Sequence, residues 1–300
     1  MRFTIFQDSH QGDRQGNEDR IGYSFSRDVL LMIVADGMGG HEGGEIAAEI
    51  AVTEITRRFQ QEARNKLRRP ADFLVTAINA AHRAIVSHAV EENLLECPRT
   101  TCTACIVQTG TAFWAHAGDS RLYVLREGKL LAATQDHSRV QQMIDAGSIT
   151  PELAATHPER NKIYSCLGGV VPPGIAVGGE LELRTGDTVL LCTDGFWGHI
   201  PASLIASLLR KQDIMRLLPG LMLEAHRRAG GQSDNISVVA MTWEAQDDPN
   251  VPDTVQADGE FTTSSNTVEL GAPPPLEDVT DEEIEKAIAE IQDAIRKVPR

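Results

Sequence analysis

The sequence predicts an α+β fold in which mainly antiparallel sheets pack between layers of helices. Two apolar runs, at 29–35 and 188–192, each end in a glycine-flanked aspartate and are typical of strands buried on both faces. Shorter strands between these runs turn at Gly110 and Gly128, which predicts hairpins. Helical periodicity is confined to segments before and after the hairpins, so helices and strands do not alternate regularly.

The elements follow in order along residues 1–245, which we predict to form one domain. A short strand and a polar loop open the chain and lead into the first buried strand. The spacing of apolar residues predicts helices that begin near Gly43 and at Pro70. Hairpins, one strand over 180–192, a helical region and a last strand beginning after Asn235 complete the domain.

Three segments depart from this core. Residues 138–170 contain short helical pieces broken by glycine and proline, as in functional lids, and we call them the flap. Residues 246–279 are acidic and rich in proline, which predicts a disordered linker. Residues 280–298 predict an amphipathic helix, for whose apolar stripe we expect a docking partner. The stripe consists of Ile284, Ile288, Ile291 and Ile295.

Composition excludes several classes of protein. The 300 residues are 41% hydrophobic and 24% charged, as in ordinary globular domains. The net charge of −15 argues against a nucleic-acid binder, which would show a basic surface. No apolar run reaches the roughly 18 residues that span a bilayer, and we recognise no signal peptide, so we expect neither membrane insertion nor export. Five irregularly spaced cysteines fit reduced thiols and a cytoplasmic location.

Acidic residues gather at the predicted strand ends. Asp36 and Asp194 end the two long apolar runs, Asp119 follows another strand, and Asp234 precedes the last one. Oxygen ligands of this kind suit Mg²⁺ or Mn²⁺, and no neighbouring His or Cys pair indicates zinc. Turn capping is the alternative explanation for any single aspartate. Recurrence at four strand ends favours one shared metal site.

The polar loop before the first buried strand adds Glu18 and Asp19 to these acids. Arg14 lies four residues before Glu18, and its planar guanidinium suits bidentate capture of a phosphate. Two cations that share a carboxylate can activate a bridging water and neutralise a phosphoryl oxygen. The pattern therefore favours metal-assisted chemistry on a phosphate ester.

Seven groups of residues, in a fixed order, carry a resemblance to a known family. They are RQGNED (14–19), ADGMGGHEGGE (35–45), TTCTACIV (100–107), AGDSR (117–121), DHS with HPERN (136–161), TDGFW (193–197) and SDNISVV (233–239). Over residues 3–243 the chain resembles the metal-dependent PP2C (PPM) family of serine/threonine protein phosphatases, in particular its compact bacterial members. The resemblance implies a central β-sandwich of two mainly antiparallel sheets flanked by helices, with the flap influencing substrate access.

The same resemblance implies a role for each site residue. Asp36 would bridge two core ions, Mn²⁺ or Mg²⁺. The implied metal ligands are Asp36, Gly37 through its carbonyl, Asp194, Asp234, Glu18 mostly through water, and Asp119 on a looser third ion. Arg14 would bind the phosphate, Asp19 would support Glu18, and Asn235 would orient Asp234 or its loop.

One position departs from the animal members of the family, which carry a histidine general acid directly after the Asp-Gly pair. Here that position is Met38, and His41 is the candidate proton donor, with a metal-bound water as the alternative. The implied reaction is hydrolysis of phosphoserine or phosphothreonine by a metal-bridging hydroxide without a phosphoenzyme.

The implied partners are phosphorylated proteins, including a bacterial serine/threonine kinase and its targets. Two alternatives share the fold: a catalytically silent binding module, and a phosphatase dedicated to one regulatory partner protein.

Overall fold

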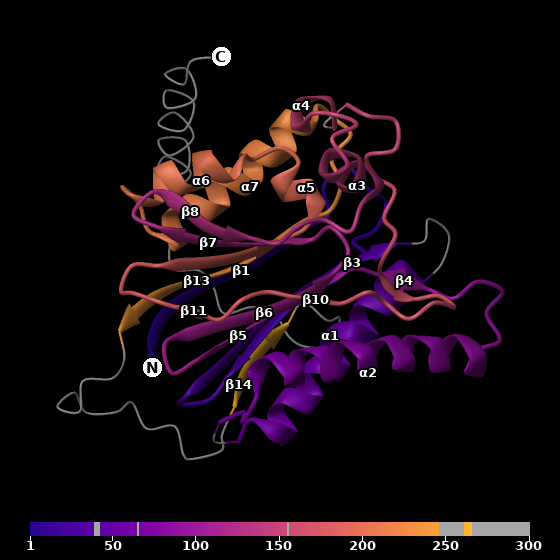
Figure 1. The fold of residues 1–300 in the computed structure, drawn as a ribbon, viewed down its shortest axis with the longest axis horizontal. Helices are drawn as coiled ribbons and strands as arrows, with labels where there is room; N and C mark the ends of the chain where they lie inside the picture. The colour runs from indigo at the N-terminus through magenta and orange to yellow at the C-terminus, as the bar shows by residue number, and fades with distance from the viewer. Residues whose placement is uncertain (39–42, 65, 155, 246–260, 266–300) are drawn as a thin grey trace.

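The computed structural model describes residues 1–38, 43–64, 66–154, 156–245 and 261–265. Within them, two antiparallel sheets face each other and helices cover the outer face of each sheet (Figure 1). The layers run helix, sheet, sheet, helix. The predicted α+β sandwich with mainly antiparallel sheets is confirmed.

The first sheet has five strands in the order β1-β13-β12-β7-β8. Its strands are β1 Arg2–His10, β7 Arg121–Arg126, β8 Lys129–Ala133, β12 Thr188–Cys192 and β13 Ile236–Ala245. β7 and β8 form a hairpin whose turn residues, Glu127 and Gly128, have positive φ angles of 49° and 80°. Such turns match the twist of the strands they join, so the predicted hairpin is confirmed.

The second sheet runs in the order β10-β6-β5-β3-β2-β14, with β4, β9 and β11 at its margins. Its strands are β2 Asp19–Phe25, β3 Val29–Met38, β4 Arg99–Thr100, β5 Cys102–Gln108, β6 Thr111–Ala117, β9 Leu167–Gly168, β10 Ala176–Val177, β11 Leu181–Glu182 and β14 Thr262–Ser265. β5 and β6 form the second predicted hairpin, which turns at Thr109 and Gly110.

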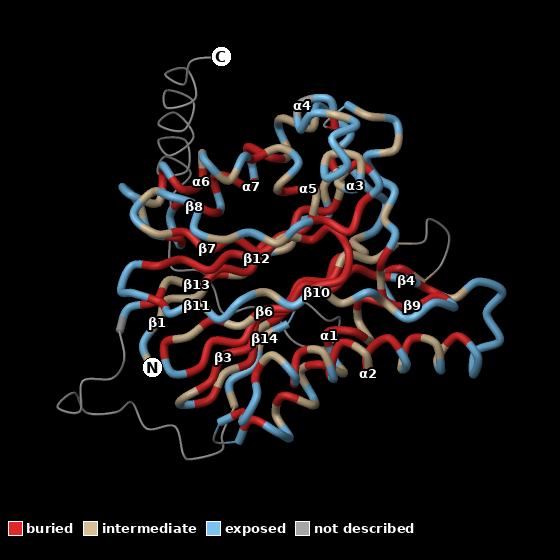
Figure 2. Tube along the Cα trace, in the orientation of Figure 1, coloured by how far each residue is buried: buried red, intermediate tan, exposed pale blue. Residues whose placement is uncertain are grey.

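β3 is the central strand, and it is buried on both faces. Leu31 and Ile33 pack against the helices outside the sheet, whereas Met32 and Val34 pack between the two sheets. Successive side chains of a strand point to opposite faces, so a strand covered on both sides must be apolar throughout. Buried residues accordingly form a continuous band through both sheets (Figure 2).

Two helix layers cover the sandwich. α1 (Gly44–Glu62) and α2 (Pro70–Glu91) cover the second sheet, and α5 (Asp194–Trp197), α6 (Ala202–Leu209) and α7 (Ile214–Ala229) cover the first. The predicted helix starts are therefore confirmed. No helix in the described ranges is long and apolar enough to cross a bilayer.

The flap begins shortly after β8, an edge strand of the first sheet, and leaves the sandwich there. It contains α3 (Arg139–Asp145) and α4 (Pro151–Ala154), and the Ser138 hydroxyl caps α3 by accepting a hydrogen bond from the Gln141 N–H. β9 returns the flap to the body by pairing with β4, which itself pairs with the end of β3. The flap is thus attached to the strand that carries Asp36.

The predicted single strand over 180–192 is wrong. The chain forms β11 in the second sheet and β12 in the first, with a turn at Gly186, whose φ is 90°. The Asp187 carboxylate fixes this turn, because it accepts a hydrogen bond from the Arg184 N–H at 2.8 Å and pairs with Arg126 at 2.6 Å. A glycine turn and a paired aspartate therefore break the strand and send its halves into different sheets.

The prediction of a disordered linker over 246–279 needs correction at one place. Thr262–Ser265 form β14, which pairs with β2. The Phe261 ring packs against Phe59 of α1 at 5.5 Å between centroids, and the Thr263 hydroxyl lies 2.7 Å from the Ser24 hydroxyl. One aromatic anchor and a free strand edge are enough to order this short polar segment. The rest of the linker and the predicted helix over 280–298 lie outside the described residues.

Candidate active site

Asp36 lies near the end of β3, where Thr100 and Thr101 hold its backbone. The Thr101 N–H and the Thr100 hydroxyl each donate a hydrogen bond to the Asp36 carbonyl oxygen at 2.9 Å. The Asp36 N–H donates to the Thr101 hydroxyl oxygen at 3.0 Å. The acid therefore sits on a rigid strand and not on a loop.

Gly37 permits three segments to meet beside Asp36. A Cβ at this position would lie 2.4 Å from the backbone of Gly44, at the start of α1, and 2.7 Å from the carbonyl oxygen of Glu18. These distances leave no room for a side chain. Glycine thus brings the end of β3, the loop before β2 and the start of α1 together.

The loop that carries Glu18 is held by Asn235. The Asn235 side-chain oxygen accepts a hydrogen bond from the Glu18 N–H at 2.9 Å, and its NH₂ group donates to the carbonyl oxygens of Gln11 and Gly16. Asp19 begins β2 directly opposite Asp36. The Asn235 side chain therefore positions the loop on which Glu18 lies.

Asp194 and Asp234 lie at the same end of neighbouring strands. Asp194 begins α5 just after β12, and Asp234 lies just before β13. A Cβ at Gly195 would lie 2.1 Å from the Asn235 carbonyl oxygen, so the two segments approach as closely as backbones can. Arg14 Nη2 lies 2.7 Å from Asp234 Oδ2, and the Arg14 side chain is 61% exposed.

Asp119 lies between β6 and β7, where Trp197 and an ion pair beside it fix its position. The Trp197 indole N–H donates a hydrogen bond to the Asp119 carbonyl oxygen at 2.9 Å. The Arg121 guanidinium lies 3.5 Å above the Trp197 ring and makes two hydrogen bonds of 2.8 Å to the Asp136 carboxylate. A partly buried ion pair thus supports the position of this acid.

Electrostatic coupling shows that the acids share one site. Burial raises the pKa of Asp36 well above its ordinary value, and the negative charges of Asp19, Asp194, Asp119 and Asp234 raise it further. Burial and then the charge of Asp194 likewise raise the pKa of Asp119. Neighbouring negative charges therefore disfavour the ionisation of Asp36 and Asp119.

Neighbouring acids follow the same trend. Burial, and next the charge of Asp234, raise the pKa of Asp194 to about 6. Burial raises the pKa of Asp19 to about 7, although the Thr193 hydroxyl donates a hydrogen bond to it at 2.9 Å. Burial also raises the pKa of Glu18. A positive charge supplied from outside the chain would stabilise all these carboxylates.

The donor set fits hard divalent cations. The acidic side chains of the cluster offer oxygen, the ligand that Mg²⁺ and Mn²⁺ prefer. Among the described residues, no three acidic, His or Cys side chains already converge closely enough to hold an ion. Binding would therefore require side-chain rotation, as at Asp234, which pairs with Arg14.

Most predicted site residues come together at this end of the sandwich. They are Arg14, Glu18, Asp19, Asp36, Gly37, Asp119, Asp194, Asp234 and Asn235. His41 lies outside the described residues. Met38 is the last residue of β3 and pairs with Arg99 of β4. The proton donor stays a prediction.

Sequence reasoning missed the residues that hold the acids in place. They are Thr100, Thr101, Arg121, Asp136, Thr193 and Trp197. All six lie inside the quoted motifs. A hydroxyl residue beside a strand-end acid, or an arginine two residues after one, is the signal that could have identified them.

Known proteins are similar to this chain both in sequence and in fold. A family model described as Protein phosphatase 2C matches residues 6–229. The serine/threonine protein phosphatase PstP of Mycobacterium tuberculosis is 35% identical over 227 residues, which cover 75% of this chain and 42% of the relative. The chain thus spans less than half the length of that relative. A putative protein phosphatase 2C-type of Streptococcus pyogenes is 31% identical over 248 residues, which cover 82% of this chain and 99% of the relative.

Solved structures share the whole sandwich. The serine/threonine phosphatase of S. agalactiae superposes with a TM-score of 0.73 at 31% identity, covering 81% of this chain and 100% of that one. The catalytic domain of PstP, solved in complex with two manganese ions, gives a TM-score of 0.66 at 30% identity and covers 80% and 97% of the two chains. Because the family model matches most of the chain and these relatives share both its sequence and its fold, the chain belongs to the protein phosphatase 2C family.

Proposed function

We propose that the protein is a metal-dependent phosphatase that hydrolyses phosphoserine and phosphothreonine in proteins. One observation carries the proposal: burial and the charges of neighbouring acids, Asp234 among them, raise the pKa of Asp36, Asp119 and Asp194 at a single end of the sandwich. Such a cluster is costly unless cations bind to it. The names of the relatives, serine/threonine phosphatases of bacteria, support the substrate class.

The acids would hold divalent cations, Mn²⁺ or Mg²⁺. Asp36, Asp194 and Asp234 would hold two core ions together with the Gly37 carbonyl and Glu18, and Asp119 would contribute to a third. The two manganese ions in the related PstP structure support this assignment. Bound cations would neutralise phosphoryl oxygens and make a water molecule acidic enough to attack phosphorus at neutral pH.

Arg14 would bind the phosphate of the substrate. It is largely exposed, and its present partner is the Asp234 carboxylate at 2.7 Å. A phosphoryl group offers the same paired oxygens as a carboxylate, so a guanidinium binds both in one geometry. Substrate phosphate would therefore compete with Asp234 for Arg14.

The three cysteines within strands are disfavoured as nucleophiles. Cys102, Cys105 and Cys192 are buried within strands, and burial raises the pKa of Cys102 to about 12. Cys102 and Cys105 also face opposite sides of β5, because residues three apart on a strand point to opposite faces. Attack by water without a phosphoenzyme fits these facts, with His41 or water protonating the leaving alkoxide.

Partners and location follow from the proposed reaction. The substrates would be phosphorylated proteins, and a bacterial serine/threonine kinase would generate them. All five cysteines are free, which supports a reducing compartment such as the cytoplasm.

The test is phosphate release from a phosphothreonine peptide with Mn²⁺, with EDTA, and with EDTA followed by excess Mn²⁺. We expect activity, loss of activity and recovery, in that order. A phosphotyrosine peptide serves as the specificity control. Undiminished release in EDTA would contradict the proposal. Binding of Mn²⁺ without turnover would favour a silent binding module, and turnover of a single phosphoprotein in a panel would favour a dedicated phosphatase.

A further inference from the structure

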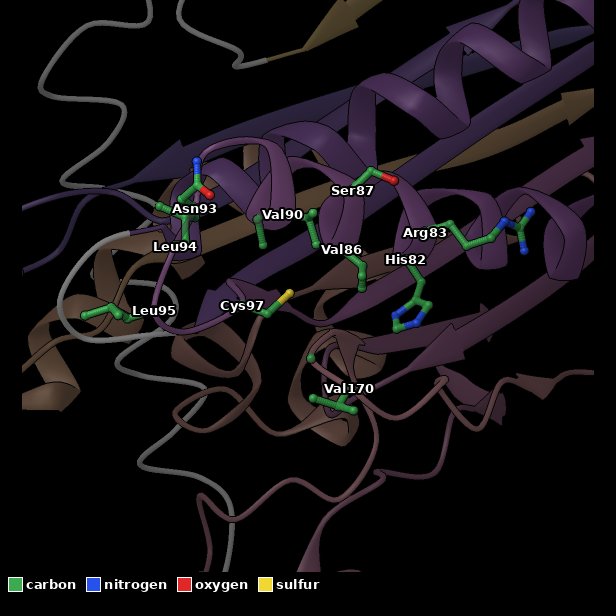
Figure 3. A pocket seen from close by; sticks show the side chains of 12 residues that line it. His82, Arg83, Val86, Ser87, Val90, Asn93, Leu94, Leu95, Cys97 and Val170 are labelled. Atoms are coloured by element: carbon green, nitrogen blue, oxygen red, sulfur yellow. The ribbon is translucent and has the colours of Figure 1, made fainter.

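An open groove runs along the C-terminal half of α2. It has a volume of about 810 Å³ and lies between α2, the loop after it and the end of the flap. Figure 3 shows α2 on one side and Val170 on the other, with Cys97 between them. The apolar residues lining it include Val86, Val90, Leu94, Leu95 and Val170.

The groove exposes more apolar surface than an isolated domain usually keeps in one place. Val90, Leu94, Leu95 and Val170 are all exposed, and Leu95 and Val170 are almost fully so, at 105% and 97%. Single exposed apolar residues are ordinary, but four around one groove indicate a surface that something covers.

The C-terminal segment has the chemistry to cover it. Residues 280–298 predict an amphipathic helix whose isoleucines all lie within one stripe, and this stripe needs burial. The segment is net acidic, with six acids and three bases. The groove is lined by Arg83, and Arg99 lies beside its residue Gly169. The isoleucine stripe is therefore complementary to the apolar groove, whereas the charges around the groove are mixed, because Glu91, Glu92 and Glu96 are interleaved in sequence with its lining residues.

β14 leads the chain toward the groove. It is antiparallel to β2, with Thr262 opposite Phe25 and Ser265 opposite Gly22, so it runs toward the Asp19 end of β2. A Cβ at Gly22 would lie 3.4 Å from the side chain of Val52 on α1. The described chain therefore stops beside the middle of α1 and heads toward the start of that helix.

The remaining distance is short enough for the linker to span. From Val52, α1 runs back to Gly43 over about 14 Å, at 1.5 Å per residue. A Cβ at Gly43 would lie 3.0 Å from Pro98, which follows Cys97 of the groove. Residues 266–279, as a flexible chain, have a root-mean-square reach of about 20 Å. The predicted helix can thus arrive at the groove without strain.

We propose that the groove is the docking site of residues 280–298 of the same chain. The docked segment covers Val90, Leu95 and Val170 with its isoleucine stripe, and it contacts the last residues of the flap. This intramolecular contact stands independently of the proposed phosphatase activity.

Disulfide trapping in the full-length protein tests the contact, because Cys97 is a partly exposed thiol in the groove. In a Cys166→Ser background, Ile284, Ile288, Ile291 and Ile295 are each replaced by Cys. Lys286→Cys and Asp293→Cys lie on the opposite side of the predicted helix and are the controls. After mild oxidation, mass spectrometry of the unreduced protein counts the linked molecules.

We expect at least one stripe variant to form an intramolecular disulfide to Cys97 about tenfold faster than both controls. Cys97→Ser should abolish it. Equal rates for stripe and control positions would overturn the proposal in favour of a solvated tail. Disulfide-linked dimers in place of linked monomers would overturn it in favour of docking onto a second copy.

A second measurement changes residues of the groove and leaves residues 280–298 unchanged. Leu95→Glu and Val170→Glu change exposed side chains, so neither should disturb the core. We expect amide hydrogen exchange in residues 280–298 of the full-length variants to accelerate at least about fivefold. Leu223→Glu, an equally apolar exposed position on α7, is the matched control and should leave it unchanged. Unchanged exchange in both groove variants would contradict the contact.

Discussion

Two groups of acids in this protein differ in how the fold balances their charge. Asp136 and Asp187 each receive two hydrogen bonds from an arginine, Arg121 and Arg126 respectively. Asp119 is as buried as these two, yet no cationic side chain among the described residues forms an ion pair with it. Asp36 and Asp194 are partly buried, and they too form no ion pair with a cationic side chain in the described part of the chain.

The extent of burial alone therefore does not distinguish the acids that serve the fold from those of the proposed metal site. The two groups differ in where the compensating positive charge comes from. An acid that serves the fold is matched by an arginine from within the chain, since an unmatched buried charge is costly. Asp36, Asp119 and Asp194 of the proposed metal site are left without such a match, so that a cation from outside supplies it, and Asp234 pairs only with the largely exposed Arg14. Removing a charge should consequently have opposite effects on stability in the two groups.

The largest effect is expected for Asp36→Asn. Cation binding contributes several kcal/mol of transition-state stabilisation, so loss of the proposed bridging ligand should lower kcat/KM by about 1,000-fold or more. In EDTA the same variant should unfold at a higher temperature than the wild type, because one of the mutually repelling charges is gone. Phosphate release and thermal unfolding measure the two results.

Glu62→Gln, which removes an exposed acid at the end of α1, is the control and should change neither quantity. An Asp36→Asn protein that is fully active, or less stable than the wild type in EDTA, would place Asp36 with the structural acids.

Asp136→Asn should act in the opposite direction. Asp136 is buried beside Arg121, and breaking such a pair leaves a guanidinium without its partner. We expect the free energy of unfolding to fall by about 3 kcal/mol. Asp72→Asn breaks the exposed pair with Arg69 and should cost less than about 1 kcal/mol. Urea unfolding measures both, and equal losses would refute the distinction between buried and exposed pairs.

A third kind of buried titratable group carries no charge in the folded protein at neutral pH, and His137 is an example. Its ring stacks on His116 at 4.6 Å, and burial, followed by the charge of His116, lowers the pKa of His137 to about 4. The pKa of the unfolded state is higher, about 6.5, so the unfolded state takes up the proton first. The stability that His137 contributes is fully present above about pH 6.5 and is lost as the pH falls toward 4.

The wild type should therefore lose roughly 2 kcal/mol more than His137→Gln between pH 7 and pH 5. Urea unfolding of both proteins in EDTA measures this difference in the free energy of unfolding. The carboxylates of the acid cluster titrate alike in the wild type and in the variant, so their contribution cancels. Parallel pH curves would show that His137 is protonated as readily as in the unfolded chain.

The smallest effect is expected for Phe261→Ala, at the anchor of β14. Phe261 is half-buried against Phe59, so its truncation should cost about 1–2 kcal/mol, less than a fully buried aromatic residue. Thr262→Ala, at an exposed position of the same strand, is the control and should cost less than about 0.5 kcal/mol. Thermal unfolding distinguishes them, and equal shifts would show that the ring does not anchor the strand.

The sequence predicted the parts of this structure whose cause is local. The run from Val29 to Ala35 is apolar without interruption, and it became the strand buried on both faces. The hairpins at Gly110 and Gly128 have their turn residues where the turns need them. The clustering of Asp36 with Asp194 was also predicted, because both end such runs.

What escaped prediction depends on contacts between distant residues. Arg121 and Asp136 are 15 positions apart, and no periodicity connects them. Thr262–Ser265 have no apolar pattern. They form a strand because they pair with the edge of β2 and because Phe261 packs against α1. Neither property is visible in the segment itself.

β14 has a consequence for how the protein can be shortened. β2 would be an outer strand without it, and outer strands with unpaired N–H and C=O groups join readily to other chains. A protein ended at Ala245 would keep every proposed ligand but expose this edge, and we expect it to self-associate. A protein ended after Ser265 would keep the edge covered by its own chain. The four residues Thr262–Ser265 thus protect the protein from aggregation by pairing with the edge of β2.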